Sequence, residues 1–212
     1  MRATAALVLV VLAESSRAFN FAASSVGFSA RRGTRSTQLV ALGGLFEMLK
    51  PKKTFDAPCV MGDESIMAQK AHGTSAKPVQ NKLRWGCKVD LADRICNFNR
   101  HYAEFAGYWE QTSFLKEESE ASGEISFYDS NTGNELFTAP RGRSFEQFVK
   151  ESRVHGWPSF RDDEVNWDYV RVLPDGEAVS VDGTHLGHNL PDKNGNRYCI
   201  NLVSVAGRPK KA

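Results

Sequence analysis

The spacing of hydrophobic residues changes along the chain, and each change predicts a different kind of element. The longest helix is predicted over Val89–Tyr108, with Asp90 as its N-cap. Its apolar residues recur at near-helical spacing: Leu91, Ile95, Phe98, Tyr102 and Phe105. A shorter helix is predicted over Ser144–Arg153, because Ser144 and Gln147 have the spacing of a capping box. Its apolar face would consist of Phe145, Phe148 and Val149.

From Glu124 onward hydrophobic residues recur at every second position, which is typical of strands. One strand begins at Ile125, a turn follows at residues 131–133, and a second strand passes through Leu136 and Phe137. Turn residues at 174–176 and 193–196 separate the later strands. These are predicted at Trp167–Leu173, Glu177–Val181 and Tyr198–Val205. The fold class expected is mainly β, with antiparallel sheets, a helical N-terminal arm and one short helical insert.

The N-terminal 40 residues have the composition of targeting segments. An apolar run at Ala3–Ala13 follows Arg2 and is too short to span a bilayer. Residues 20–40 contain three arginines and no acidic residue. A signal followed by such a segment, starting at Phe19, resembles the bipartite plastid presequences of algae with secondary plastids. We therefore expect a signal plus transit presequence at 1–40 and a plastid location, with a secretory leader as the alternative.

The rest of the chain divides by composition. Residues 41–82 are polar, and we expect a linker or flexible arm there. The folded domain is expected at 83–207, followed by a basic tail at 208–212. A net charge of +2 over 212 residues argues against a nucleic-acid or membrane partner. The mean hydropathy of -0.41 over the whole chain agrees with a soluble protein.

Four cysteines are present, and none forms a CxxC pair, which argues against a zinc ribbon and a thioredoxin-type motif. They are Cys59, Cys87, Cys96 and Cys199. A reducing compartment favours catalytic thiols, whereas a secreted protein would use the same four in two disulfides.

Cys199 lies in a predicted strand with polar neighbours. Strand alternation puts it on one face with Arg197 and Asn201, and puts Tyr198 and Ile200 on the other face. A single cysteine in a strand is more often a small buried residue. A polar face around the thiol is poor core material, however, and the charge of Arg197 favours the reactive thiolate.

Two histidines, His185 and His188, flank Leu186-Gly187. An imidazole titrates near neutrality and therefore suits proton transfer. Two histidines without a third ligand are weak evidence for a metal, and a structural role for either one is about as expected as a catalytic role. Trp157 precedes Pro158, which restricts its backbone, although a tryptophan is also common core material.

Three blocks, Gly156–Phe160, Gly183–His188 and Arg197–Asn201, occur in an order that resembles the signature of the SelR-type methionine-R-sulfoxide reductases. The resemblance extends over roughly residues 100–205. It implies a small barrel-like domain that reduces methionine-R-sulfoxide, in oxidised proteins or as the free amino acid. The resemblance also implies which residues form the active site. Cys199 would be the nucleophile that becomes a sulfenic acid and then a disulfide. The sulfoxide oxygen would be protonated or bound by His188, the stronger candidate, and by His185 and Asn201. The substrate pocket would contain Trp157, Trp109 and Asp192, with Asp192 orienting His188.

The chain departs from this family in two respects. The resemblance places Asp129, Thr132, Val179 and Asp182 where many members carry zinc-binding cysteines, so we expect a zinc-free variant without a metal or other cofactor. His155 stands at a frequent position of the resolving cysteine. Cys96 is the leading substitute, ahead of Cys87 and Cys59. Otherwise a thioredoxin or glutathione thiol would attack Cys199 directly.

The expected partners are therefore the oxidised substrate and a thioredoxin-like dithiol donor, and the expected oligomeric state is a monomer. The alternative function is a non-catalytic reader or sensor of the same fold, which recognises oxidised or methylated thioethers without turnover. The missing zinc ligands and the missing resolving position motivate this alternative.

Overall fold

The computed structural model describes residues 54–119 and 123–210. The expected signal and transit segments lie outside the described residues, as do 41–53 of the expected linker and the last two residues of the basic tail. Within the described ranges, no helix has both the length and the apolar composition needed to cross a membrane.

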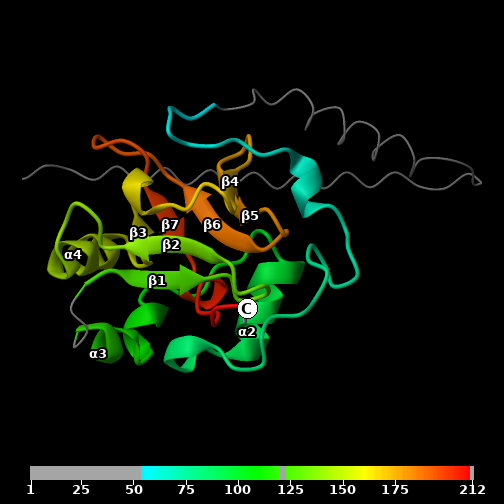
Figure 1. Cartoon of the computed structure of the whole chain (residues 1–212), viewed down its shortest axis with the longest axis horizontal. Helices are drawn as coiled ribbons and strands as arrows, with labels where there is room; N and C mark the ends of the chain where they lie inside the picture. Colours follow the sequence, from blue (N-terminus) through cyan, green and yellow to red (C-terminus); the bar gives the residue numbers. More distant parts are fainter. Residues whose placement is uncertain (1–53, 120–122, 211–212) are drawn as a thin grey trace, which may run out of the picture. The chain divides into compact units, whose positions relative to one another are not determined.

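A five-stranded antiparallel sheet forms the centre of the domain, in the order β3-β7-β6-β5-β4 (Figure 1). Its strands are β3 (Ser159–Phe160), β4 (Val170–Val172), β5 (Glu177–Ser180), β6 (His185–Asn189) and β7 (Tyr198–Ile200). Three of these lie within the strands predicted from the sequence. β3 and β6 carry two of the three motif blocks and did not show a strand pattern.

A second sheet is a two-stranded antiparallel hairpin of β1 (Ile125–Tyr128) and β2 (Glu135–Ala139), as predicted. Neither sheet closes on itself within the described residues, because the edge strands β3 and β4 do not pair with each other. The mainly antiparallel β architecture is confirmed, together with short helices. The barrel-like closure is not present in the described part of the chain.

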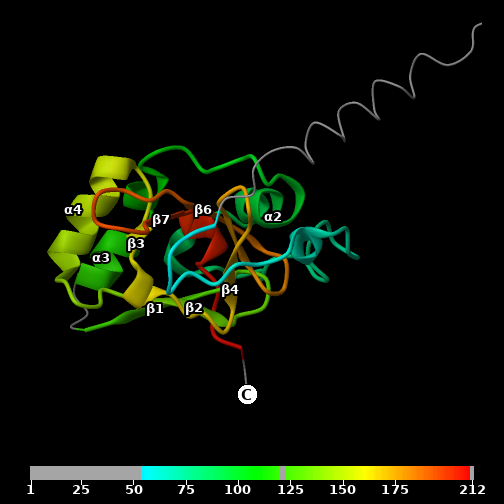
Figure 2. The same ribbon diagram turned by 90° about the horizontal axis from the view of Figure 1, so that it is seen from above.

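The helices are short. They are α2 (Val89–Asp93), which continues as a π-helical turn at Arg94–Phe98, α3 (Phe114–Ser119) and α4 (Phe145–His155). Short 3₁₀ turns occur at Glu64–Met67, Arg84–Gly86, Tyr108–Gln111, Asp162–Glu164 and Leu202–Ser204. Figures 1 and 2 both show α3 and α4 at one end of the β1–β2 hairpin and α2 at the other.

The prediction of one helix over Val89–Tyr108 is wrong in two respects: the helix is shorter, and part of its predicted apolar face is exposed to solvent. It begins after Lys88 and ends at Phe98, and the side chains of Phe98 and Phe105 are 58% and 53% exposed. The physical reason is tertiary: the chain leaves the helix so that Glu104 reaches the core and accepts hydrogen bonds there. The loop that results borders the candidate site.

The capping box of α4 is confirmed. The Ser144 hydroxyl accepts from the Gln147 backbone N–H at 3.2 Å, and the Gln147 side chain accepts from the Ser144 N–H at 2.8 Å. Phe148 and Val149 are buried, as predicted. Gly156 ends the helix with a φ of 87°, a left-handed conformation in which a side chain would also meet Ala106.

Phenylalanines join the two sheets and α4 into one core. The Phe160 ring stacks on Phe137 of β2 at a centroid distance of 4.4 Å, and meets Phe127 of β1 at 5.0 Å and Phe148 of α4 at 5.5 Å. Aromatic pairs at these distances stabilise a core beyond their simple burial. Phe160 therefore fixes the Gly156–Phe160 block against the rest of the domain.

Residues 54–82, expected to belong to a linker or flexible arm, contact the rest of the domain, and residues 60–62 pair with the β4 edge of the sheet. Gly62 donates its N–H to the Val172 carbonyl at 2.8 Å, and Val172 donates to the Val60 carbonyl at 3.0 Å. Met67 and Val79 in this segment are buried. The folded part of the chain therefore begins before residue 83.

Candidate active site

A cavity of about 270 Å³ brings the three sequence blocks together. Its wall contains five residues proposed from the sequence: Trp157, His185, His188, Cys199 and Asn201. Residues 100–103, Gly187 and Leu190 complete the lining. The cavity therefore combines a thiol, two imidazoles, an amide and an indole, contributed by β6, β7 and the loops beside them.

The β-sheet register aligns the reactive groups. His188 of β6 lies opposite Cys199 of β7, and Glu177 of β5 lies opposite His188. Residues opposite one another in an antiparallel pair point to the same face of the sheet. A Cβ atom at Gly187 would lie 2.1 Å from the Cys199 carbonyl oxygen, so only glycine allows this close approach of β6 to β7.

Cys199 and its two neighbours in β7 point to alternate faces of the sheet, as predicted. Tyr198 and Ile200 are fully buried on the core side, and Cys199 is partly exposed in the cavity. Burial raises the pKa of the Cys199 thiol, and the charge and hydrogen bond of Arg197 oppose that rise. The thiol is accordingly less acidic than an exposed cysteine, and Arg197 limits the penalty.

Arg197 is itself buried. Its Nε and Nη1 atoms have no hydrogen-bond partner among the described residues, and Nε lies 3.7 Å from the Asp192 carboxylate. A buried guanidinium with donors to spare interacts strongly with a negative group brought near it. Such a group is available at Cys199 whenever the thiol ionises.

The two histidines have different surroundings. The Nδ1 atom of His185 lies 2.6 Å from Glu177 Oε1, and both side chains are buried. The pKa of His188 is lowered by its own burial and by the neighbouring His185, whose ring centroid is 5.7 Å away. His188 is therefore predominantly neutral at neutral pH.

Asn201 is held from two sides. Its Oδ1 accepts the backbone N–H of Glu104 at 3.1 Å, and its Nδ2 donates to the Leu186 carbonyl at 3.1 Å. These partners fix which end of the amide is the donor, because an N–H must meet oxygen and a carbonyl must meet nitrogen. One N–H of Nδ2 remains for a ligand in the cavity.

Four residues assigned to the site lie outside the cavity wall: Arg197, described above, and three others. Trp109 is fully buried in the core, with its ring 6.1 Å from that of Phe114. Asp192 bonds Arg161 at 2.8 Å and approaches Arg197, so arginines rather than His188 are its partners. Cys96 is fully buried, and its thiol lies 3.5 Å from the Ser204 hydroxyl. Burial raises its pKa.

At the positions where the resemblance would put zinc cysteines, hydrogen bonds connect the two turns instead. The Thr184 hydroxyl bonds the buried Asp129 carboxylate at 3.0 Å, and Asn134 donates to Asp182 at 2.9 Å. Both bonds join the β1–β2 turn to the segment between β5 and β6. They perform the structural task of a crosslink without thiolate ligands.

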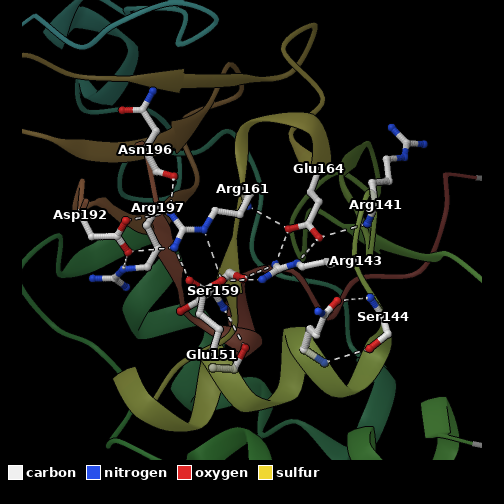
Figure 3. Close-up of polar contacts among 12 residues, drawn as sticks. Arg141, Arg143, Ser144, Glu151, Ser159, Arg161, Glu164, Asp192, Asn196 and Arg197 are labelled. Carbon is white, nitrogen blue, oxygen red and sulfur yellow. Dashed lines mark hydrogen bonds and ion pairs between the residues drawn. The ribbon is translucent and has the colours of Figure 1, made fainter. Parts of the chain in front are cut away.

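One group of side chains in the described ranges has the spacing of metal ligands: the ligand atoms of Glu151, His155 and Asp192 lie within 4.8 Å of one another. Arg161 bonds the carboxylates of both Glu151 and Asp192, as Figure 3 shows. Arg143 also pairs with Glu151, at 2.5 Å. Because both carboxylates are already paired with arginine, the donor set is a poor match for a cation.

Two buried carboxylates in this region were not assigned from the sequence. Glu177 contacts His185. Glu104 makes four hydrogen bonds, three with residues 201–203, just after Cys199, and one with Trp157. Glu177 stood at the start of a predicted strand and Glu104 inside a predicted helix, so the local pattern suggested solvent for both. The signal that could have found Glu104 is its place in a polar segment, 96–104, that a simple amphipathic helix does not need.

Comparison of the chain with protein-family models, with curated proteins and with solved structures finds no match in any of the three.

Proposed function

We propose that the protein is a thiol oxidoreductase that reduces methionine-R-sulfoxide, a peptide-methionine (R)-S-oxide reductase of the zinc-free SelR type. The observation that carries the proposal is the single cavity into which Trp157, His188 and Cys199 project from three separate sequence blocks. The cavity's volume of about 270 Å³ suits a side chain of the size of methionine sulfoxide.

The chemistry assigned to the cavity is a two-electron oxygen transfer. The Cys199 thiolate attacks the sulfoxide sulfur and forms a transient sulfur–sulfur bond. The oxygen then moves to the Cys199 sulfur: a new S–O bond forms there, the substrate's S–O bond and the transient S–S bond break, and the oxygen becomes the hydroxyl of a sulfenic acid on Cys199. One proton is consumed, the substrate sulfur is reduced to a thioether, and the Cys199 sulfur is oxidised. The hydrogen bonds of His188 and Asn201 stabilise the negative charge on the oxygen as the bond breaks.

Trp157 supplies the wall for the methyl group. Its indole N–H donates to the Glu104 carbonyl at 2.9 Å, which fixes the ring relative to the sheet that carries Cys199. An apolar aromatic face selects substrates by shape. We assign the preference for one sulfoxide epimer to this fixed wall.

Regeneration requires a second thiol. A sulfenic acid and a thiol condense to a disulfide with loss of water, and a dithiol donor then reduces the disulfide. Cys96 has no exposed surface and bonds Ser204. We therefore assign the resolving step to an external thiol, such as that of a thioredoxin, which would work on the mature protein in the plastid.

The deciding experiment is the substitution Cys199→Ser, assayed with each epimer of a methionine sulfoxide peptide and with dithiothreitol as reductant. The proposal requires reduction of the R epimer by the wild type and its complete loss in the variant, whereas the S epimer is not a substrate of either. Unchanged reduction of the R epimer by Cys199→Ser would sink the assignment.

A second candidate is a reader of oxidised thioethers that does not turn over. The raised pKa of Cys199 favours it, because a less acidic thiol gives less of the reactive thiolate at neutral pH. Counting free thiols after a single exposure to the sulfoxide separates the two functions. The enzyme loses one thiol per chain and a reader loses none.

A further inference from the structure

Glu177 is a buried carboxylate whose two oxygens have different partners. Oε1 lies 2.6 Å from Nδ1 of His185, and Oε2 accepts from Arg100 at 2.5 and 2.9 Å. The side chains of Glu177 and His185 are each 2% exposed, so water does not compete for these bonds. Arg100 is held in turn by Glu64 at 2.5 Å.

This chain of contacts ends at the cavity. Arg100 and His185 both belong to its wall, together with His188 and Cys199. Burial alone would raise the pKa of Glu177, but the hydrogen bonds from His185 and Arg100 outweigh it and lower the pKa. Glu177 is therefore a carboxylate at neutral pH, and it accepts from Nδ1 of His185.

An imidazole that donates from Nδ1 to a carboxylate directs its other nitrogen, Nε2, away from that carboxylate. In catalytic sites, such a carboxylate fixes the tautomer and the orientation of the ring, so that Nε2 can face the reacting atoms. Among the described residues, His188 has no such hydrogen-bonded carboxylate. The two histidines consequently divide two tasks: His188 is a neutral hydrogen-bond donor and His185 carries the mobile proton.

We infer that Glu177 is a positioning residue that makes His185 the proton donor to the sulfoxide oxygen, an inference that rests on the proposed reductase function. In the step itself, the proton leaves Nε2 of His185 and becomes the hydroxyl hydrogen of the Cys199 sulfenic acid. His185 is left neutral and is reprotonated from solvent through the open cavity. Glu177 stays ionised throughout and does not exchange a proton.

The test compares Glu177→Gln with the matched control Glu64→Gln, which removes a carboxylate from Arg100 without touching His185. For the R epimer with dithiothreitol, kcat falls about 100-fold in Glu177→Gln, at the low end of what a positioned general acid contributes. KM changes little, because Glu177 does not contact the substrate. Glu64→Gln keeps the wild-type kcat.

A double-mutant cycle shows whether Glu177 acts through His185. In a His185→Asn background, Glu177→Gln has no further effect on kcat if the inference holds. Equal fold losses of kcat in both backgrounds overturn it. A larger loss in His188→Asn than in His185→Asn also overturns it, because the proton would then come from His188.

Nitrogen-15 NMR of the wild-type protein provides a measurement that needs neither turnover nor a folded variant. The inference requires a proton on Nδ1 of His185, and a ring protonated on Nε2 alone overturns it. A wild type that reduces neither epimer contradicts the proposed function, whereas the NMR result still decides whether Glu177 and His185 are paired as described.

Discussion

Trp157 donates its indole N–H to the backbone carbonyl of Glu104, 2.9 Å away, and so couples the wall of the cavity to a buried acid. The backbone N–H of the same Glu104 holds Asn201, and its carboxyl group accepts the N–H groups of Leu202 and Val203. One residue of the loop after α2 thus fixes both sides of the site.

The first prediction concerns stability and pH. Burial raises the pKa of Glu104 from 4.5 to about 8, although the hydrogen bonds from Leu202 and Val203 oppose the rise. A group whose pKa is higher in the folded state stabilises the fold most below its unfolded pKa. This contribution is lost as the pH rises toward 8, and each tenfold difference in proton affinity between the folded and unfolded states corresponds to about 1.4 kcal/mol. We expect the free energy of unfolding to decline between pH 5 and 8, and Glu104→Gln to flatten this decline.

Urea unfolding at pH 5, 6, 7 and 8 measures the effect. Glu104→Gln is less stable than the wild type at pH 5, because Leu202 and Val203 bond different oxygens of Glu104 and one of these becomes an NH2 group, which cannot accept. Glu110→Gln, which removes a partly exposed acid paired with Arg153, keeps the wild-type slope. If the free energy of unfolding of Glu104→Gln declines with pH as steeply as that of the wild type, a group other than Glu104 causes the decline.

The second prediction concerns the reactivity of the thiol. Arg197 opposes the rise in the pKa of Cys199 that burial causes. In Arg197→Met this support is absent, so the pKa of Cys199 rises further. The rate of iodoacetamide alkylation at pH 7 falls, and the whole pH profile moves to higher pH. Arg153→Met, an exposed control, leaves the profile unchanged. If Arg197→Met and the wild type have the same pH profile of alkylation, Arg197 does not oppose the rise in the pKa of Cys199.

The third prediction concerns the approach of β6 to β7. In Gly187→Ala the new methyl group meets the Cys199 carbonyl oxygen at 2.1 Å, so the two strands must separate. We expect a loss of about 1–3 kcal/mol in the free energy of unfolding. Turnover is also lost, because His188 and Cys199 no longer face each other. Gly142→Ala has no atom within 4 Å of the added Cβ and keeps full activity. An active Gly187→Ala would mean that the strand pair has room to adjust.

The fourth prediction concerns the second half-reaction. Cys96 is fully buried and bonded to Ser204. We therefore expect Cys96→Ser to keep its turnover with thioredoxin as the donor, within about threefold of the wild type. Mass spectrometry of the oxidised enzyme would then find Cys199 joined to the donor and not to Cys96. A Cys96–Cys199 disulfide, or a Cys96→Ser variant active only with dithiothreitol, would restore Cys96 as the resolving thiol.

Local patterns predicted the elements whose stabilising partners are close in sequence. The capping box at Ser144 and the alternation of Tyr198, Cys199 and Ile200 are examples, and both are observed. The helix predicted as far as Tyr108 was too long, because Glu104 is bound by Leu202 and Val203, almost a hundred residues later. Contacts of that separation leave no periodic signal in the helix itself.

The candidate site also combines features that local sequence predicted with features that depend on distant contacts. Residue types alone indicated which groups are available: a thiol beside an arginine, two imidazoles and a tryptophan in three short blocks. Folding brings His188 opposite Cys199 across β6 and β7 and Glu177 to His185, and it leaves Trp109, Asp192 and Cys96 outside the cavity wall. The physical reason is that residue identity specifies chemical reactivity, whereas strand register and burial are properties of the whole folded chain.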